Sequence, residues 1–118
     1  MHNIRNIYFV GIGGIGMSAL ARYFHLQKYN VAGYDLTRTA LTSTIENEGI
    51  PVTYEDNLQE IPKSFRAPDN TLVVYTPAIP KNHTILNWFQ NQNFEIVKRA
   101  ALLGKITRKE KSIAVAGT

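Results

Sequence analysis

The sequence of 118 residues contains no cysteine, so disulfide bonds, thiolate nucleophiles and cysteine-ligated metal sites are excluded. It also has no apolar run of about 20 residues, the length that a membrane-spanning helix requires, and its first residues lack the apolar stretch of a signal peptide. The three histidines, at positions 2, 25 and 83, show no spacing typical of metal ligands. We expect no metal, no membrane partner and a location in the reducing cytoplasm.

Charge is sparse and mixed in sign. The formal net charge is +4, and the only dense group of positive residues lies between positions 105 and 111. A nucleic-acid interface usually shows a longer basic stripe with interleaved aromatic residues for stacking, so no nucleic-acid partner is predicted. A mild positive excess is compatible with an anionic small ligand.

What the sequence does contain is an alternation of short apolar runs and amphipathic segments, which indicates strands joined by helices. Strands are predicted at 4–10, 31–35, 52–54, 71–75, 94–98 and 112–116. Helices are predicted at 17–28, 37–48, 82–92 and 99–108, with a helical turn at 58–61 and a loop at 62–70. Asn82 is expected to cap the third helix and Gly49 to end the second. The alternation predicts one α/β domain, a Rossmann-like three-layer fold with a mainly parallel sheet in the strand order 3-2-1-4-5-6.

A glycine-rich turn connects the first predicted strand to the first predicted helix, with the sequence GIGGIG at 11–16. Its G-x-G-x-x-G spacing is typical of nucleotide-binding turns, in which each glycine has its own task. Gly11 permits a tight turn, Gly13 lets the backbone approach a diphosphate, and Gly16 lets the helix pack closely on the sheet. The first helical amides and the helix dipole stabilise an anion at this place.

Two side chains near this turn are expected to assist binding. The Ser18 hydroxyl lies in the first helical turn and is an expected donor to the anion. Asp35 ends the second predicted strand, about 20 residues after Gly16, where an acid typically contacts a ribose hydroxyl. The alternative is a glycine turn that serves only the packing of the helix on the sheet.

The loop after the predicted strand 71–75 is expected to form the opposite wall of the site, because ligands of open α/β sheets bind beyond the carboxyl ends of the strands. Thr76, Pro77, Ala78 and Ile79 begin this loop, and their backbone is expected to shape the pocket. Arg99 directly follows the fifth predicted strand and is expected to reach an anion at the same edge. The alternatives are a plain strand-ending turn and a surface ion pair.

Four sequence blocks together resemble the N-terminal domain of the Mur ligase family. They are FVGIGGIGMS at 9–18, GYDL at 33–36, AIP at 78–80 followed by Asn82, and Arg99-Ala100 with AVAGT at 114–118. The blocks occur in the order of the family over the whole chain. The glycine block with Gly-Met-Ser is specific to the family, whereas each of the other blocks alone would be weak evidence.

This resemblance implies that residues 1–118 form the N-terminal UDP-sugar-binding domain of an ATP-dependent ligase, which adds L-alanine to UDP-N-acetylmuramate in peptidoglycan precursor synthesis. In the family an ATP phosphate loop follows A-V-A-G-T, so the ATP-binding central domain is expected beyond Thr118. The domain alone is expected to bind UDP-N-acetylmuramate or UDP without a cofactor and without catalysis, while ATP and magnesium serve the full-length enzyme. The residues expected to contact the UDP moiety are Gly11, Ile12, Gly13, Gly14, Ile15, Gly16, Met17, Ser18, Asp35, Leu36, Thr37, Thr76, Pro77, Ala78, Ile79 and Arg99.

Three positions depart from the family pattern. Tyr34 stands where a small serine is usual, and it is expected either to stack on the uridine or to crowd it. Glu55-Asp56 stands where a His-Asp pair is frequent, which leaves a sugar contact from that histidine open. Thr76-Pro77 replaces two serines and thereby removes one hydroxyl donor and one backbone N–H.

The alternative function is an NAD-binding domain of a dehydrogenase or of a ligand-gated regulator. The glycine turn and the acid after the second strand fit both functions. Gly-Met-Ser after the turn, Ala-Ile-Pro after the fourth strand and the A-V-A-G-T block favour the ligase domain, because a nicotinamide site requires none of them.

Overall fold

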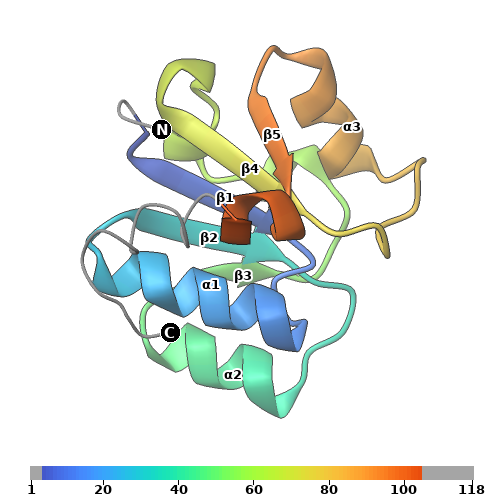
Figure 1. Cartoon of the computed structure of the whole chain (residues 1–118). Helices are drawn as coiled ribbons and strands as arrows, with labels where there is room; N and C mark the ends of the chain where they lie inside the picture. The colour runs from blue at the N-terminus through green and yellow to red at the C-terminus, as the bar shows by residue number, and fades with distance from the viewer. Residues whose placement is uncertain (1–3, 105–118) are drawn as a thin grey trace.

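The computed structural model describes residues 4–104, which form a five-stranded sheet with every neighbouring pair of strands parallel (Figure 1). The strand order β3-β2-β1-β4-β5 confirms the predicted α/β class and the first five places of the predicted order. The strands are β1 (Asn6–Val10), β2 (Asn30–Tyr34), β3 (Val52–Thr53), β4 (Thr71–Tyr75) and β5 (Glu95–Lys98). The strand predicted at 112–116 lies outside the described residues.

Helices and short helical turns connect these strands. The helices are α1 (Ile15–Leu26), α2 (Ala40–Asn47) and α3 (Thr84–Asn91), and residues 99–104 are also helical. Three 3-10 turns precede β4, namely η1 (Leu58–Glu60), η2 (Lys63–Phe65) and η3 (Pro68–Asn70). Two of them fall within 62–70, so the prediction of a plain loop there is wrong. None of the described helices is long and apolar enough to cross a membrane.

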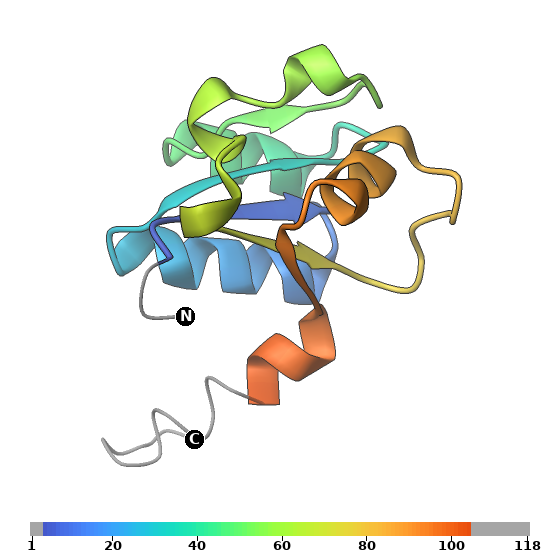
Figure 2. The ribbon, with the colours of Figure 1, turned by 90° about the horizontal axis from the view of Figure 1, so that it is seen from above.

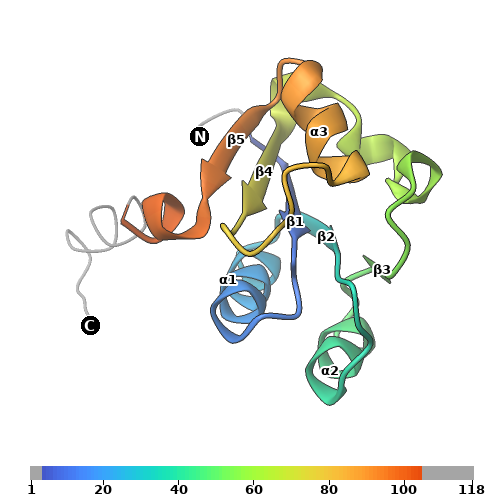
Figure 3. The same cartoon turned by 90° about the vertical axis from the view of Figure 1, so that its right-hand side faces the viewer.

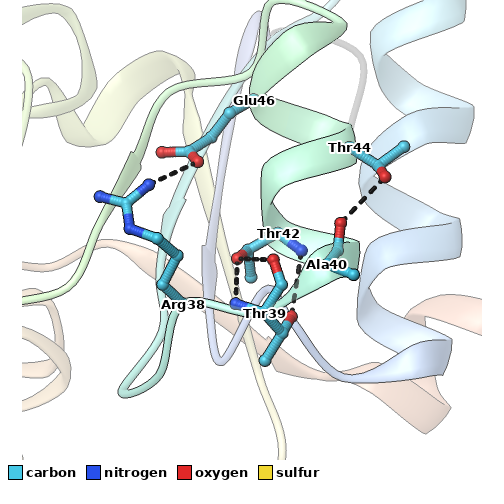
Figure 4. A network of polar contacts seen from close by, with 6 residues as sticks. All are labelled: Arg38, Thr39, Ala40, Thr42, Thr44 and Glu46. Atoms are coloured by element: carbon cyan, nitrogen blue, oxygen red, sulfur yellow. Dashed lines mark hydrogen bonds and ion pairs between the residues drawn. The ribbon is translucent and has the colours of Figure 1, made fainter.

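The start of α2 is fixed by a capping box, and the helix therefore begins three residues later than predicted. Thr42 N donates to Thr39 Oγ1 at 3.2 Å, and Thr39 N donates to Thr42 Oγ1 at 2.8 Å (Figure 4). Two amides at the helix start are thus paired reciprocally by side chains. At the other end, Gly49 has a φ of 102°, which confirms it as the glycine that ends this helix.

The start of α3 is also set by a side chain, although by a different one than predicted. His83 is the N-cap, and its ring atom Nδ1 accepts from Leu86 N at 3.3 Å. The prediction that Asn82 caps this helix is therefore wrong by one residue. Asn is the commoner cap, so local preference alone points to the wrong position.

The sheet separates two hydrophobic clusters, which gives the domain the three predicted layers (Figure 3). All five residues of β1 are buried, and alternate side chains enter opposite clusters. Ile7 and Phe9 pack on the side of α1 and α2. Tyr8 and Val10 pack on the side of α3 and η2. The central strand is thus fixed from both sides.

Three strands end level with one another at the carboxyl edge of the sheet. Val10 of β1 pairs with Tyr34 of β2 on one side and with Tyr75 of β4 on the other. The glycine turn, the β2–α2 loop and the β4–α3 loop therefore start from the same edge. This is the edge at which open parallel sheets bind their ligands.

Gly33 in β2 gives the glycine turn the room that it needs. Gly33 pairs with Phe9, and a Cβ atom at Gly33 would lie 2.5 Å from the Phe9 carbonyl oxygen and 2.8 Å from Ile12 Cδ1. The side chain of Ile12 is fully buried. A glycine at position 33 therefore lets Ile12 anchor the turn in the core.

Gly33→Ala is expected to lower the free energy of unfolding by about 1–3 kcal/mol, the usual cost of overpacking a core. Chemical denaturation followed by circular dichroism measures the change. Gly104→Ala is the matched control, because a Cβ atom at Gly104 meets nothing within 4 Å. Equal stability of the two variants would contradict this account of Gly33.

Candidate functional site

The glycine turn is anchored to the end of β2 by main-chain hydrogen bonds. Gly11 has a φ of 94°, a conformation that favours glycine, as predicted for the tight turn. The amides of Gly11 and Ile12 both donate to the carbonyl oxygen of Tyr34, at 2.8 and 2.9 Å. Ile12 points into the core, whereas Ile15 is 85% exposed. The turn therefore has a fixed inner side and an accessible outer side.

Asp35 holds the next part of the turn from the β2–α2 loop. Its Oδ2 accepts from Gly13 N at 2.7 Å, and its Oδ1 accepts from Thr37 N at 3.1 Å. A Cβ atom at Gly13 would lie 2.7 Å from Asp35 Oδ2 and 2.8 Å from Thr42 Cγ2. The missing side chain at Gly13 thus makes room for Asp35 and Thr42. The expected contacts of Gly13 with a diphosphate and of Asp35 with a ribose stay predictions.

The first turn of α1 presents backbone donors without partners. Gly14 is the N-cap, no side chain caps the helix, and its first turn contains no acidic residue. The amides of Ile15, Gly16 and Met17 have no hydrogen-bond partner within residues 4–104. Such amides, together with the helix dipole, form a place of positive potential that suits an anion. The predicted phosphate-binding turn therefore has the required local geometry.

Ser18 has its hydroxyl group engaged within the helix. The residue is buried, and its Oγ donates to the carbonyl oxygen of Ile15 at 3.0 Å. A hydroxyl has a single proton to donate. In this arrangement Ser18 has no proton left for a ligand, in contrast to the expectation from its position.

Arg99 lies against the start of α1. It opens the helical segment 99–104, drawn in orange-red, which directly follows β5 (Figure 2). A Cβ atom at Gly16 would lie 2.9 Å from Nη1 of Arg99 and 3.2 Å from its Cδ and Cζ. The space left by the missing side chain of Gly16 is thus occupied by Arg99. The sequence instead predicts that Gly16 lets the helix pack closely on the sheet. Arg99 makes no ion pair with any residue in the range 4–104. A guanidinium group therefore lies beside the unpaired amides of α1.

The β4–α3 loop, predicted to form the opposite wall of the site, lies against the glycine turn. Ile79 N donates to Thr76 O at 3.1 Å, which closes a turn directly after β4. The side chain of Ile79 packs over the glycine turn, because a Cβ atom at Gly11 would lie 3.3 Å from Ile79 Cδ1. Pro77 and Ala78 are exposed at the tip of this turn. Of the predicted wall residues, Ile79 is the one that contacts the glycine turn.

Leu36 and Thr37 lie at the rim of the same edge. Both residues are exposed, and Leu36 is exposed to 79%. Thr37 contributes its amide to Asp35. Together with Ile15, Leu36 gives this edge two large apolar side chains that face solvent. In the part of the chain that the structure describes, no group of three or more His, Asp or Glu side chains is placed to hold a metal ion.

Tyr34 is buried on the α3 side of the sheet and does not lie at the rim. It is 5% exposed, and its ring meets the ring of His83 edge to face with 4.6 Å between centroids. Burial, followed by the nearby charges of Asp56 and Asp35, raises the pKa of Tyr34. Stacking of Tyr34 on a uridine, one of the two expected consequences of this residue, does not fit such a placement.

Asp56 has a task that the sequence does not reveal. Its two carboxylate oxygens accept from Thr84 N at 2.7 Å and from Ile85 N at 2.8 Å, so it caps α3 from the segment after β3. A cap supplied from 28 residues away leaves no local signature.

The sequence is similar to that of known ligases over nearly its whole length. The profile of the Mur ligase family, catalytic domain, matches residues 6–111. A UDP-N-acetylmuramate–L-alanine ligase from Porphyromonas gingivalis is 50% identical over 115 residues, which are 98% of this chain and 25% of that protein. The enzyme of the same name from Christiangramia forsetii is 51% identical over an alignment of 119 positions, which covers 100% of this chain and 26% of that protein. The chain thus spans about a quarter of the length of these relatives.

The fold is also similar to that of a solved structure. The crystal structure of the UDP-N-acetylmuramate–alanine ligase from Thermotoga maritima matches 90% of this chain and 23% of its own chain, with a TM-score of 0.80 and 29% identity. The three-layer arrangement around the glycine turn is therefore the arrangement of that enzyme in the matched part.

Asp35→Ala is expected to release the Gly13 amide in the absence of any ligand. The Gly13 N–H resonance should move upfield and exchange faster with solvent, because a bond to a charged acceptor is lost. The free energy of unfolding should fall by about 1–2 kcal/mol. Asp69→Ala, an exposed carboxylate in η3, is the control and should leave the Gly13 resonance in place. An unchanged Gly13 resonance in Asp35→Ala would contradict the bond.

Proposed function

The chain belongs to the Mur ligase family, and from this premise we propose that it binds the UDP moiety of UDP-N-acetylmuramate at the glycine turn. We further propose that the protein acts as an ATP-dependent ligase, which joins L-alanine to this substrate in the cytoplasm for peptidoglycan synthesis. The names of the relatives support the substrate and the reaction. The site supports a role of this chain in binding and positioning the substrate.

One observation carries the proposal for UDP. The unpaired amides at the start of α1 and the guanidinium group of Arg99 converge at one place. The amides suit one phosphate group and the guanidinium can form paired hydrogen bonds with phosphate oxygens. A diphosphate is an anion with enough oxygens for both. Either element alone would be a weaker indication.

The outer rim supports a nucleoside next to this diphosphate. Ile15 and Leu36 are exposed to 85% and 79%, and single exposed apolar residues are ordinary. Here the two belong to the turn and to the loop that Asp35 links together. A nucleobase has apolar faces that such side chains can cover. The Asp35 carboxylate retains lone pairs that can accept from a ribose hydroxyl in addition to its two amides.

The proposed share of this chain in the reaction is positioning. In the proposed reaction the substrate carboxylate takes the terminal phosphoryl group of ATP, which leaves as ADP, and the amine of L-alanine displaces phosphate from the resulting acyl phosphate to form the amide. Magnesium would neutralise charge on the ATP phosphates. We assign the groups for this activation to the three quarters of the relatives that this chain does not span. Contacts to the remote UDP end supply binding energy that can hold the reacting carboxylate in place. The residues named above then bind and orient, and none of them makes or breaks a bond.

Titration with UDP is expected to shift the amide resonances of residues 13–18 in heteronuclear NMR spectra, because the ligand adds acceptors at the start of α1. Residues of η3, which precedes β4 at the opposite edge of the sheet, should shift less and serve as the internal control. NAD at the same concentration should cause smaller shifts. Shifts with NAD but not with UDP would contradict the proposal and favour a dinucleotide site.

Arg99→Met is expected to weaken UDP binding about tenfold or more, because a charged donor to the diphosphate is lost. Isothermal titration calorimetry at low and high salt measures the effect, and the salt dependence of binding should decrease in the variant. Arg22→Met is the matched control. Arg22 lies away from the site and forms an ion pair with Glu48, with 2.7 Å between Nη2 and Oε2. Equal affinities of the two variants would remove Arg99 from the site.

A further inference from the structure

One ring nitrogen in the core has both a donor and an acceptor within reach. Nδ1 of His83 lies 3.3 Å from Leu86 N, which can only donate, and 3.3 Å from Oδ1 of Asp56, which as a carboxylate oxygen can only accept. Nδ1 can pair with one of them at a time. Without a proton it accepts from Leu86 N and caps α3. With a proton it can only donate, to Asp56.

The surroundings of the ring favour the form without a proton on Nδ1. His83 is 6% exposed, and burial lowers its pKa, while Asp56 acts in the opposite direction. A cation at the start of a helix also opposes the helix dipole. In the neutral ring the proton resides on Nε2, which is buried and has no hydrogen-bond partner in the described part of the chain. The neutral ring is thus held by its cap to α3.

His83 is mechanically connected to the proposed nucleotide site by two routes. It ends the loop that carries Ile79 over Gly11, and its own amide donates to Pro80 O at 3.1 Å. Its ring packs edge to face on Tyr34. The carbonyl oxygen of Tyr34 in turn holds two amides of the glycine turn. A change in the position of His83 can therefore affect both the β4–α3 loop and the glycine turn.

We propose that His83 is a proton-sensitive positioning residue, whose neutral ring holds the β4–α3 wall in the binding conformation and whose protonation loosens it. The proposal rests on the proposed function, because it assigns a form of regulation to the UDP site. It predicts that acidification weakens binding of the nucleotide even though His83 need not touch it. In the protonated form, Nδ1 of His83 donates a hydrogen bond to the neighbouring Asp56 carboxylate.

The other ionisable side chains around the ring belong to residue types that ordinarily keep their charge state between about pH 5 and pH 7. Tyr34 of β2 faces the ring, and Tyr8 of β1 interacts electrostatically with Tyr34, Asp56 and Glu60 of η1. Burial raises the pKa of both tyrosines, so they stay neutral. Carboxyl groups ordinarily titrate near pH 4, and histidine near pH 6.5. Lys81, two residues before His83, is exposed. His83 is thus the group that can respond between about pH 5 and pH 7.

The sign of the effect follows from the lowered pKa. Since the folded-state pKa of His83 lies below its unfolded value, the protein is more stable above the unfolded pKa and loses this contribution as the pH falls to the folded-state pKa. Ligand that prefers the neutral form must, by linkage, lower the pKa of His83 further.

The first test observes the ring directly. Long-range proton–nitrogen NMR spectra of the wild-type chain report the tautomer and the pKa of each imidazole. We expect His83 to carry its proton on Nε2 at neutral pH and to titrate below the ordinary histidine value. Saturation with UDP-N-acetylmuramate should lower the pKa of His83 further. UDP-N-acetylmuramate is chosen because its diphosphate is esterified at both ends. The ligand therefore lacks the ionisation near pH 6 of a terminal phosphate. A proton on Nδ1 at neutral pH would overturn the proposal.

The second test measures affinity for UDP-N-acetylmuramate by calorimetry at about pH 7.5 and about pH 5.5, values on either side of an ordinary histidine pKa. The wild-type dissociation constant should rise on the order of fivefold at the lower pH, the lower end of usual coupling between sites. His83→Asn keeps an acceptor for Leu86 N that does not titrate, so its affinity should be nearly the same at both values. His25→Asn is the matched control, since His25 lies on α1 against the Glu48 carbonyl, and it should behave like wild type.

The outcomes separate the two proposals. Binding that is as pH-dependent in His83→Asn as in wild type, or independent of pH in both, overturns the role of His83 and leaves the UDP site standing. No binding at any pH in the wild type overturns the UDP site and the role of His83 with it. If His83→Asn fails to fold, the response of the wild-type ring to bound ligand still decides the question.

Discussion

The site depends on the way in which the glycine turn is tied to the end of β2. The carbonyl oxygen of Tyr34 receives the amides of Gly11 and Ile12, and the carboxylate of Asp35 receives the amide of Gly13. These three bonds use the donors on the inner side of the turn. The amides of Ile15, Gly16 and Met17 at the start of α1 remain without a partner in the described part of the chain. The last residue of β2 and the residue that follows it thus determine which amides of the turn are already paired.

Arg99 and the β4–α3 loop complete this arrangement from strands that are far apart in the sequence. Arg99 follows β5 and reaches the first turn of α1 because Gly16 has no side chain. Ile79 follows β4 and covers Gly11. Parallel strands deliver all these segments to the same edge. The topology therefore gathers the amides, the cation and the apolar rim at one place.

Most of the fold and part of the site could be predicted from the sequence. The strand at 71–75 was predicted to the residue, because an apolar run is bounded there by Asn70 and by Pro77, which cannot donate to a ladder. Gly11 and Gly49 have the positive φ angles that their positions imply. These features are local, and local sequence encodes them.

What escaped prediction depends on contacts between distant segments. Asp56 caps a helix 28 residues away, and Asp35 accepts from the amide of Gly13, a bond that the spacing alone does not predict. Likewise, the placement of Tyr34 on the α3 face follows from strand register, and that of Arg99 from the packing of the segment after β5. Only the assembled sheet fixes these neighbours.

The opposite placements of two isoleucines in the glycine turn have a consequence for the energetics of recognition. Ile12 is sealed in the core while Ile15, three residues later, is bare to solvent. The loop cannot swing outward unless Ile12 is drawn into water, at a cost of roughly 1.5–3 kcal/mol. Its shape is therefore set before a ligand arrives. Association then loses little conformational entropy from this loop, and more of the contact energy is left for affinity.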